Sequence, residues 1–357
     1  MPLHWLILIT LLTLLLLSMI YKRSALKRVR YARTFDKRAV FAGETVQMVE
    51  TIANDKLLPL PWIRLESMMQ SGLHFDRQEN LDIHRGDRLQ NHKSLFSLLP
   101  YRQIVRRHRV RCAKRGVYRL DSATMTAGDP FGLAEAVQTV KLSLELVVYP
   151  EPVLLDAIPF SNRGWMGELT VRRWTMEDPF LTSGVRDYVP GDSLRSIHWQ
   201  ATARAGTLQV RQNDYTSERK LTLLVNFETT ERMWNQVTKP ELVEYLLGCA
   251  AAVADYIVSQ GMEVGFCCNG RLPSDPHRTV SIPEGGGLAH LTHLLDTMAR
   301  LEMRIASNFH TLLEREIERD AEQVDYLVLT ATMSEETELR LERLRARGHH
   351  VETVKLS

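Results

Sequence analysis

The pattern of apolar and polar positions changes twice along the chain. Leu3 to Ile20 is almost uninterruptedly apolar. From Thr34 to about Pro152, short stretches of alternating apolar and polar residues are separated by turn residues, which is typical of β-strands. From about Arg219 to the end, continuous apolar runs of strand length alternate with longer stretches of helical spacing. These patterns predict a multidomain α+β protein.

The first apolar run has the length of a membrane anchor. At roughly 1.5 Å per residue, a helix over residues 3–20 just crosses the hydrocarbon core of a bilayer. A cleavable signal peptide is the rival interpretation, but it needs positive charge before the run and small residues after it. Here the basic residues follow: Lys22, Arg23, Lys27, Arg28, Arg30 and Arg33. The positive-inside rule then predicts a single-pass protein of the cell membrane whose soluble part is cytoplasmic.

Charge and cysteine content limit the partners and the compartment. The net charge of +2 becomes about −4 when the six cations after the anchor are set aside, so the body of the protein does not favour polyanions overall. The four cysteines show no C-x-x-C spacing, and Cys267 and Cys268 would point to opposite faces of a strand. A reducing compartment is therefore sufficient.

Residues 34–152 predict a β-sandwich. Candidate strands include Thr45 to Ile52, Trp62 to Glu66, Val105 to Cys112 and Leu142 to Tyr149. Many short strands with turn residues between them indicate an antiparallel sandwich of immunoglobulin-like kind. No catalytic set of residues emerges from this region.

A cluster of basic residues runs from Arg102 to Arg119 without an acid among them. One interpretation is a nucleic-acid-binding hairpin. The other is an ordinary hairpin with Val110 and Cys112 inward and Arg109 and Arg111 outward, facing solvent or anionic lipid. Aromatic residues for base stacking are not interleaved with the charges, so we expect no nucleic acid.

Residues 220–357 predict an α/β domain with a parallel sheet. The expected strands are Leu221–Phe227, Met262–Cys267, Val324–Leu329 and His350–Leu356. The expected helices are Glu241–Ser259, Leu288–Met298 and Glu335–Arg347. Strand and helix alternate, which favours parallel strands covered on both faces.

A charged segment from Gly184 to Gln212 separates the two halves. Pro190 and Gly191 fit the centre of a type II turn. Asp192 then stands at the N-cap of a predicted amphipathic helix from Ser193 to about Arg204, with Leu194, Ile197 and Ala201 facing the core. Gly206 ends that helix, and a strand begins near Leu208.

This segment closely resembles the signature block of the bacterial domain-of-unknown-function 58 (DUF58) family. The matching positions are Arg186, Tyr188, Pro190, Gly191, Asp192, Arg195, Ile197, Trp199, Ala203, Arg204, Gly206, Leu208 and Val210. Gly43–Val46, Leu58–Glu66, Arg115–Leu120 and Gly128–Leu133 resemble the family's upstream landmarks. The resemblance implies a signature connector over residues 153–219 and a von Willebrand factor A-like domain over residues 220–357. It also implies a MoxR-type AAA+ ATPase as partner, often with a transglutaminase-like membrane protein.

A von Willebrand factor A-like domain often holds Mg²⁺ through an Asp and two hydroxyls after its first strand, because hard oxygen ligands suit that ion. Here Asn226, Glu228 and Thr230 stand at the matching positions. The first is neutral and the second is a bulky acid, and the later loop reads Thr330-Ala331-Thr332. We therefore expect a degenerate site without metal, and no cofactor.

These observations predict a non-enzymatic membrane adaptor through which the ATPase acts on client proteins. The predicted docking residues are Arg186, Asp187, Tyr188, Asp192, Arg195, Trp199, Arg204 and Glu228. Two alternatives stay open: a hydrolase or metal-dependent enzyme using Asp187, Asp192, His198 and Glu228, and the nucleic-acid binder described above. Ser196 lies inside the predicted helix rather than on a sharp elbow, which disfavours a hydrolytic triad.

Overall fold

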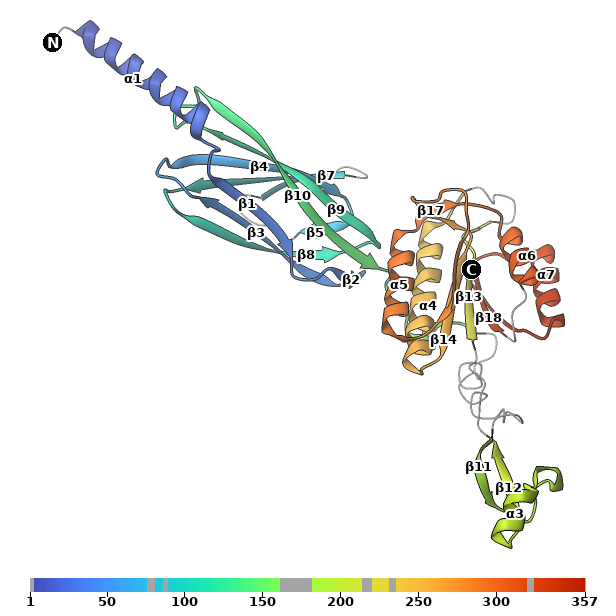
Figure 1. Ribbon diagram of the computed structural model, residues 1–357. Helices are drawn as coiled ribbons and strands as arrows, with labels where there is room; N and C mark the ends of the chain where they lie inside the picture. The colour runs from blue at the N-terminus through green and yellow to red at the C-terminus, as the bar shows by residue number, and fades with distance from the viewer. Residues whose placement is uncertain are drawn as a thin grey trace. The chain divides into compact units, whose positions relative to one another are not determined.

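A computed structural model describes residues 3–75, 81–85, 89–160, 182–213, 220–230, 236–319 and 324–356 (Figure 1). The chain divides into two compact units. The first is Met1–Glu151 together with Asp296–Arg300, and the second is Pro152–Leu295 with Leu301–Ser357. Each unit is described by itself below.

The chain begins with helix α1, Leu3–Ser24. Its mean hydropathy of 2.4 and its length suit a membrane span, which is compatible with either an anchor or a signal sequence. A second helix, α4 (Pro240–Ser259), passes the same test of length and composition. However, 61% of its apolar window is buried inside the protein, so α4 is a core helix.

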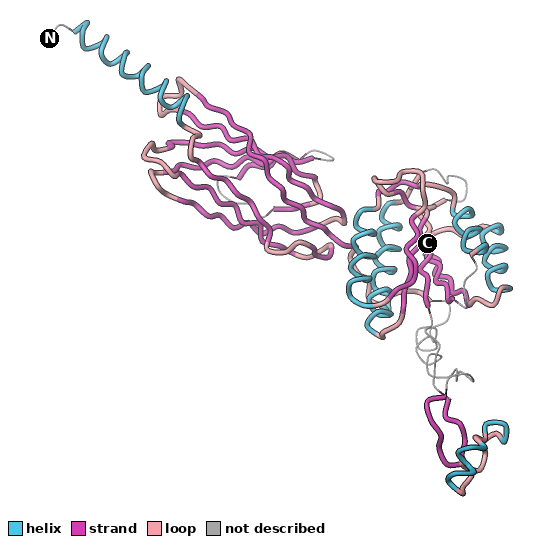
Figure 2. The backbone as a smooth tube through the Cα atoms, in the orientation of Figure 1, coloured by secondary structure: helices cyan, strands magenta, loops and turns pink. Residues whose placement is uncertain are grey.

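Residues 29–149, here called the two-sheet region, form two sheets (Figure 2). The four-stranded sheet has the order β1-β3-β8-β5, with β1 Val29–Phe35, β3 Thr45–Asn54, β5 Leu73–Phe75 and β8 Gln103–Cys112. The six-stranded sheet has the order β2-β10-β9-β4-β7-β6. Its strands are β2 Ala39–Phe41, β4 Leu60–Gln70, β6 Leu81–Arg85, β7 Leu89–Leu98, β9 Gly116–Gly128 and β10 Glu135–Tyr149. Neighbouring strands are antiparallel except for the β2–β10 pair.

Two apolar clusters fill the space between these sheets, and a polar layer separates them. Ile52 and Leu65 belong to one cluster, while Met48 and Met69 belong to the other. Between them Glu50 accepts hydrogen bonds from Arg33 at 2.7 Å and from the Tyr31 hydroxyl at 2.6 Å. Both charged side chains are almost wholly buried. Removing either partner would leave a buried charge uncompensated, which is strongly unfavourable.

The prediction that the basic residues from Arg102 to Arg119 lie on a hairpin is wrong. β8 lies in the four-stranded sheet and β9 in the six-stranded sheet, so the turn after Cys112 crosses between sheets. The alternation along β8 is nevertheless confirmed: Val110 and Cys112 are buried, and Arg109 and Arg111 are exposed. The alternation of apolar and polar residues in a strand does not reveal whether the strand pairs with the next strand or with one farther along the chain. The first strand also begins at Val29, before the predicted boundary at Thr34.

Residues 220–356, here called the sheet-and-helix region, contain a five-stranded sheet of order β16-β14-β13-β18-β19. Its strands are β13 Lys220–Val225, β14 Glu263–Cys268, β16 Val280–Gly285, β18 Val324–Thr330 and β19 His350–Lys355. β13, β14, β18 and β19 pair in parallel, as predicted, whereas the edge strand β16 is antiparallel and was not predicted.

Helices cover both faces of this sheet. Figure 1 shows α4 and α5 (Gly287–Arg300) on one face and α6 (Phe309–Glu318) and α7 (Glu335–Ala346) on the other. α6 was not predicted from the sequence. A small two-stranded sheet joins β15 (Gly270–Arg271) to β17 (Glu302–Ile305), and a 3-10 turn, η1, covers Leu155–Ala157. The four cysteines are buried and form no disulfide in the described chain.

Residues 182–213, here called the hairpin segment, form an antiparallel pair. β11 (Thr182–Asp187) pairs with β12 (Gln209–Asn213). Between them lie the 3-10 turn η2 (Leu194–Ser196) and the short helix α3 (Trp199–Ala205). The single helix predicted from Ser193 to Arg204 is therefore wrong, because the chain is extended at Ile197 and His198.

Candidate docking site

The turn of the hairpin segment is held by one ion pair. Arg186 donates two hydrogen bonds to the two carboxylate oxygens of Asp192, each at 2.7 Å. Asp192 also accepts from the backbone of Val189 at 2.9 Å. The side-chain bonds from Arg186, followed by this backbone bond, lower the pKa of Asp192 to about 2. A bidentate arginine–carboxylate pair fixes both distance and orientation, so the pair sets the path of the turn.

The predicted turn at Pro190 and Gly191 agrees with the structure. The Asp192 amide donates to the Val189 carbonyl at 3.0 Å, and Gly191 has a φ of 116°, which glycine adopts without strain. The predicted N-cap role of Asp192 is wrong, because its carboxylate is occupied by Arg186 and Val189. Ser193 caps η2, and the Nδ1 atom of His198 caps α3 by accepting from Ala201 at 3.1 Å.

Packing explains why the predicted helix is interrupted. Ile197 forms an isolated β-bridge with Val210, and these two side chains are almost fully buried. The His198 amide donates to the Gln209 carbonyl at 2.8 Å, which continues that pairing. An extended residue at Ile197 thus gives the segment its small core. Gly206, with a φ of 72°, ends α3 as predicted.

Most other apolar side chains of the hairpin segment are exposed. Trp199 is 69% and Leu194 is 70% exposed, although Leu194 was predicted to face the core. Val185, Val189 and Leu208 are exposed as well. A two-stranded pair has little hydrophobic core of its own, and contiguous exposed apolar groups mark interaction surfaces. This concentration of exposed apolar groups makes the hairpin segment the candidate docking site.

The predicted docking residues divide into two groups within this segment. Arg195, Trp199 and Arg204 are exposed and available to a partner. Arg186 and Asp192 bind each other, and Asp187 accepts a hydrogen bond from the Gln209 amide. Tyr188 is half-buried, and its backbone amide donates to Leu208 at 2.9 Å. The second group therefore shapes the surface that the first group presents.

Glu228 belongs to a different site, at the carboxyl end of β13. Asn226 accepts from the Glu228 amide at 2.9 Å and donates to the Thr330 hydroxyl at 3.1 Å. Glu228 accepts from the Phe309 amide at the start of α6, at 2.7 Å. Burial raises the pKa of Glu228, although the bonds from Phe309 and Asn269 oppose that rise. We call Asn226, Glu228, Asn269 and Thr330 the sheet-top cluster.

Asn269 was not predicted from the sequence and is central to this cluster. Its carbonyl oxygen accepts from the Phe227 amide at 2.8 Å. Its amide nitrogen lies 3.2 Å from Oδ1 of Asn226 and 3.3 Å from Oε1 of Glu228. The amide thus satisfies two of the oxygens that a cation would need. Its position after the second parallel strand was the available signal, because the carboxyl ends of such strands meet at one sheet edge.

These residues do not fit a divalent cation. The cluster offers a single carboxylate, whose pKa is raised, and an amide nitrogen occupies the space between its oxygens. The hydroxyl oxygen of the half-buried Thr230 is shielded from solvent and has no hydrogen-bond partner in the described chain. No group of three His, Cys, Asp or Glu residues suited to a metal occurs within the described ranges. The absence of a bound metal remains a prediction.

The residues of the alternative enzyme hypothesis do not form a triad. Within the hairpin segment Asp192 binds Arg186, Asp187 binds Gln209, and the Nδ1 atom of His198 caps α3. The hydroxyl of Ser196 donates to the Ser193 carbonyl at 2.6 Å. Glu228 has its own partners in the sheet-top cluster. Each group is therefore engaged in a separate local contact.

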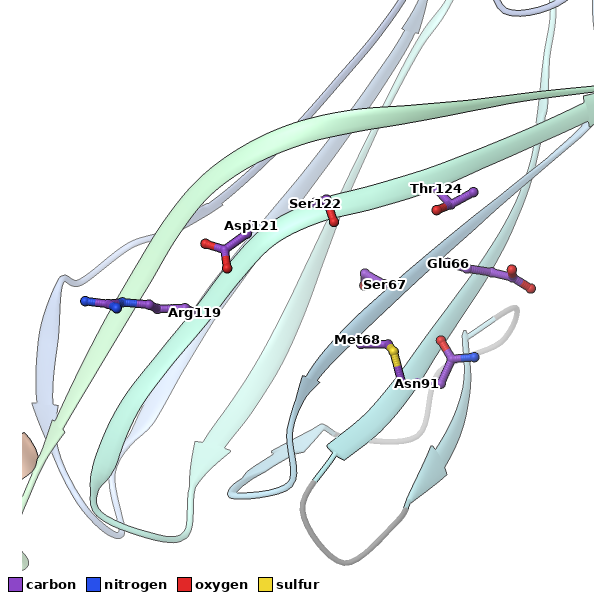
Figure 3. A pocket seen from close by; sticks show the side chains of 8 residues that line it. All are labelled: Glu66, Ser67, Met68, Asn91, Arg119, Asp121, Ser122 and Thr124. Carbon is purple, nitrogen blue, oxygen red and sulfur yellow. The ribbon is translucent and has the colours of Figure 1, made fainter. Parts of the chain in front are cut away.

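A polar pocket of about 400 Å³ lies on the six-stranded sheet (Figure 3). Pairing between β4 and β9 ends at Glu66 and Thr124, while both strands continue beside other neighbours. The pocket occupies this opening and is lined by Glu66, Ser67, Met68, Asn91, Arg119, Asp121, Ser122 and Thr124. Arg119 is already paired with Glu145 at 2.8 Å. The lining carries both signs of charge and suits water or a small polar molecule.

One match to a known protein family covers most of the hairpin segment together with the sheet-and-helix region. The sequence model of the family described as "Protein of unknown function DUF58" matches residues 184–357, from the hairpin segment to the chain end. A curated relative, "Uncharacterized protein YeaD" of Bacillus subtilis strain 168, is 20% identical over 320 residues. That match covers 87% of this chain and 72% of the relative. Neither description names an activity.

Two solved structures each resemble about a third of the chain. A non-cellulosomal cohesin from Archaeoglobus fulgidus is 12% identical and covers 33% of this chain and 91% of its own, with a TM-score of 0.22. The full-length major pilin SpaD from Corynebacterium diphtheriae is 11% identical and covers 33% of this chain and 34% of its own, with a TM-score of 0.24. TM-scores this low carry no argument about fold or function.

Proposed function

We propose that this protein is a non-enzymatic, membrane-anchored adaptor that docks a MoxR-type AAA+ ATPase through the hairpin segment. In this role α1 is a single-pass anchor and the rest of the chain lies in the cytoplasm. The ATPase would act on client proteins at the membrane, together with a transglutaminase-like membrane protein in some assemblies.

The exposed apolar side chains on the segment that carries the Arg186–Asp192 ion pair are the observation that supports the docking proposal. Trp199 and Leu194 are exposed on a segment whose turn is fixed by two 2.7 Å hydrogen bonds. A preformed surface loses little conformational entropy on binding, and tryptophan and arginine are frequent centres of binding energy. Arg195 and Arg204 add positive charge that can pair with acids of a partner.

The identity of the partner rests on the resemblance of the signature block to DUF58 proteins. The match of the DUF58 model to residues 184–357 supports this step because it begins within the hairpin segment. For the same reason we propose that the sheet-and-helix region is a von Willebrand factor A-like domain. Its parallel strands, with helices on both faces, are what such a domain requires. The two facing antiparallel sheets favour an immunoglobulin-like sandwich for the two-sheet region.

The cytoplasmic orientation rests on charge. Lys22, Arg23, Lys27 and Arg28 are exposed directly after the apolar part of α1, and the helix has no acidic residue in its first turn. Positive charge beside a span favours the cytoplasmic side. A protease added to intact cells should leave a C-terminal tag uncleaved, whereas protease added after permeabilisation should remove it.

The docking proposal can be tested by capture of the full-length protein from detergent-solubilised membranes. We expect a C-terminal tag to recover an AAA+ ATPase in one nucleotide state, with ATP or without it. Trp199→Ala should lower recovery at least tenfold, because loss of a central aromatic contact costs about 2 kcal/mol or more. Leu339→Ala is the matched control, since Leu339 is an exposed apolar residue on α7.

Two results would contradict the proposal. One is equal recovery of the ATPase by wild type and Trp199→Ala. The other is recovery of no AAA+ ATPase in either nucleotide state, which would remove the adaptor function itself.

A further inference from the structure

Three loops and the end of α1 meet at one end of the two-sheet region. The β3–β4 loop is tied to the chain after α1, because the Asp55 amide donates to the Arg28 carbonyl at 2.9 Å. The β7–β8 loop joins it where the Tyr101 amide donates to the Lys56 carbonyl at 3.3 Å. The β9–β10 loop lies at the same end, since Trp62 at the start of β4 donates to the Asp129 carbonyl at 3.2 Å.

The helix is fixed to this end rather than joined through a free linker. Tyr21 and Ala25 are buried in the apolar cluster that also contains Ile52 and Leu60. Just after the helix ends at Ser24, Lys56 donates to the carbonyl oxygens of Ala25 and Lys27 at 2.5 and 2.9 Å. Burial lowers the pKa of Lys56 to about 8. Helix and sheets therefore share one core.

The length of α1 places this junction at membrane depth. Its side chains are exposed from Leu3 to Leu16, apart from the half-buried Leu14. These positions rise about 21 Å along a helix, and the whole apolar run to Ile20 rises about 27 Å, while a bilayer core is about 30 Å thick. Contact with the protein begins within this run: Leu17 packs against the shared cluster and Ser18 is buried, while Met19 and Ile20 stay exposed. A bilayer spanned by residues 3–20 therefore ends close to the adjoining loops, at the level of the headgroups.

The side chains at this end have the chemistry of a membrane interface. Their large apolar members, each more than half exposed, are Leu57, Leu99, Tyr101, Phe131 and Leu133. Exposed basic residues occur on the helix end and loops that meet here: Lys22, Arg23, Lys27, Arg28 and Arg102. Apolar and aromatic side chains together with cations suit the boundary between acyl chains and anionic headgroups. We call these five apolar residues the loop surface.

We propose that the loop surface inserts into the headgroup region of an anionic phospholipid bilayer, as a second membrane contact beside α1. The inference rests on the proposed membrane anchor. It extends that proposal because the shared core prevents the two-sheet region from turning freely about the helix. The two-sheet region then stands at a fixed angle to the membrane.

Depth-dependent fluorescence quenching of the full-length protein in vesicles tests the inference. An environment-sensitive dye is attached to single cysteines at Leu11→Cys, Leu57→Cys, Leu133→Cys and Leu339→Cys. The native cysteines are buried and should react slowly under native conditions. Vesicles of phosphatidylcholine with phosphatidylglycerol carry a nitroxide either near the headgroup or deep in the acyl chain.

We expect Leu11→Cys to be quenched most by the deep nitroxide. Leu57→Cys and Leu133→Cys should be quenched most by the shallow nitroxide, with emission shifted to the blue, and Leu339→Cys should be unaffected. Quenching at Leu11→Cys without quenching at either loop position would overturn the inference and leave the anchor intact. Lack of quenching at Leu11→Cys would instead overturn the anchor. Unchanged loop quenching in vesicles of phosphatidylcholine alone would remove the requirement for anionic lipid.

Discussion

The hairpin segment and the sheet-top cluster are both rich in polar side chains, but they use them in opposite ways. In the sheet-top cluster the polar atoms of Asn226, Glu228 and Asn269 bind one another or nearby backbone, and the side chains are buried. In the hairpin segment one ion pair shapes the turn, while Trp199 and two arginines remain exposed. A high number of polar side chains therefore does not by itself identify a binding surface. Polar groups that already form hydrogen bonds within the protein are not available to bind a partner.

The largest effect should come from breaking the sheet-top cluster. Asn226→Ala leaves the Glu228 amide, the Asn269 amide and the Thr330 hydroxyl with fewer partners in a buried site. We expect the free energy of unfolding to fall by about 2–3 kcal/mol. Urea unfolding of the full-length protein in detergent measures it. A loss below about 0.5 kcal/mol would show that these bonds add little to stability.

A local effect should follow from breaking the ion pair of the hairpin segment. Arg186→Ala removes both bonds to Asp192 and should raise amide hydrogen exchange at Val189 and Asp192 at least tenfold, without unfolding the sheet-and-helix region. Exchange followed by mass spectrometry measures this, with the exposed Arg195→Ala as control. Equal exchange in both variants would mean that the pair does not hold the turn.

The same ion pair predicts a pH dependence. The pKa of Asp192 is lowered to about 2 by the bonds from Arg186 and Val189. A lowered carboxyl pKa means that the stabilisation is fully present above the unfolded-state value, near 4, and is lost as the pH falls through about 2. Protection of the Val189 amide should therefore persist at pH 4 in wild type. Loss of that protection already at pH 5 would contradict the assignment.

A smaller effect, on metal binding, should appear when a second carboxylate is introduced into the sheet-top cluster. We expect no saturable Mg²⁺ or Mn²⁺ binding by wild type in calorimetry. Asn269→Asp removes the amide between Asn226 and Glu228 and adds a second carboxylate, so weak Mn²⁺ binding should appear. Micromolar Mn²⁺ binding by wild type would contradict the metal-free interpretation.

The smallest effect on stability should come from the exposed tryptophan. Trp199→Ala removes a side chain that is 69% exposed, so the free energy of unfolding should change by less than about 0.5 kcal/mol. The same substitution should lower recovery of the ATPase at least tenfold. A large loss of stability would show that Trp199 packs against another part of the chain rather than a partner.

Periodicity predicted most of the sheet-and-helix region. The strands around Leu223 and Leu327 are largely apolar runs, and the apolar residues of α4 recur at helical spacing. In these elements the sequence pattern therefore agrees with the buried environment. α6 was missed because its apolar face is short and its exposed face is highly charged. β16 was missed because Pro283 interrupts its pattern, which an antiparallel edge strand tolerates.

The candidate site was harder to predict because long-range contacts decide it. The helix expected after Asp192 has helical spacing at Leu194, Ile197 and Ala201, but pairing of Ile197 with Val210 overrides that local signal. In the two-sheet region the alternation of buried and exposed residues along β8 was predicted correctly. The sheet to which β8 belongs was not, because it depends on the pairing of β8 with β3. Asn269 carried no motif, and only the meeting of parallel strands at one edge brings it to Asn226.

The most direct test of the docking proposal is site-specific photocrosslinking in native membranes. The photoreactive residue p-benzoylphenylalanine replaces Trp199 in one full-length variant and Leu339 in another. We predict that the variant at position 199 crosslinks to an AAA+ ATPase in one nucleotide state and that the variant at position 339 does not. A crosslink to the ATPase from position 339 but none from position 199 would contradict the assignment of the hairpin segment as the docking surface.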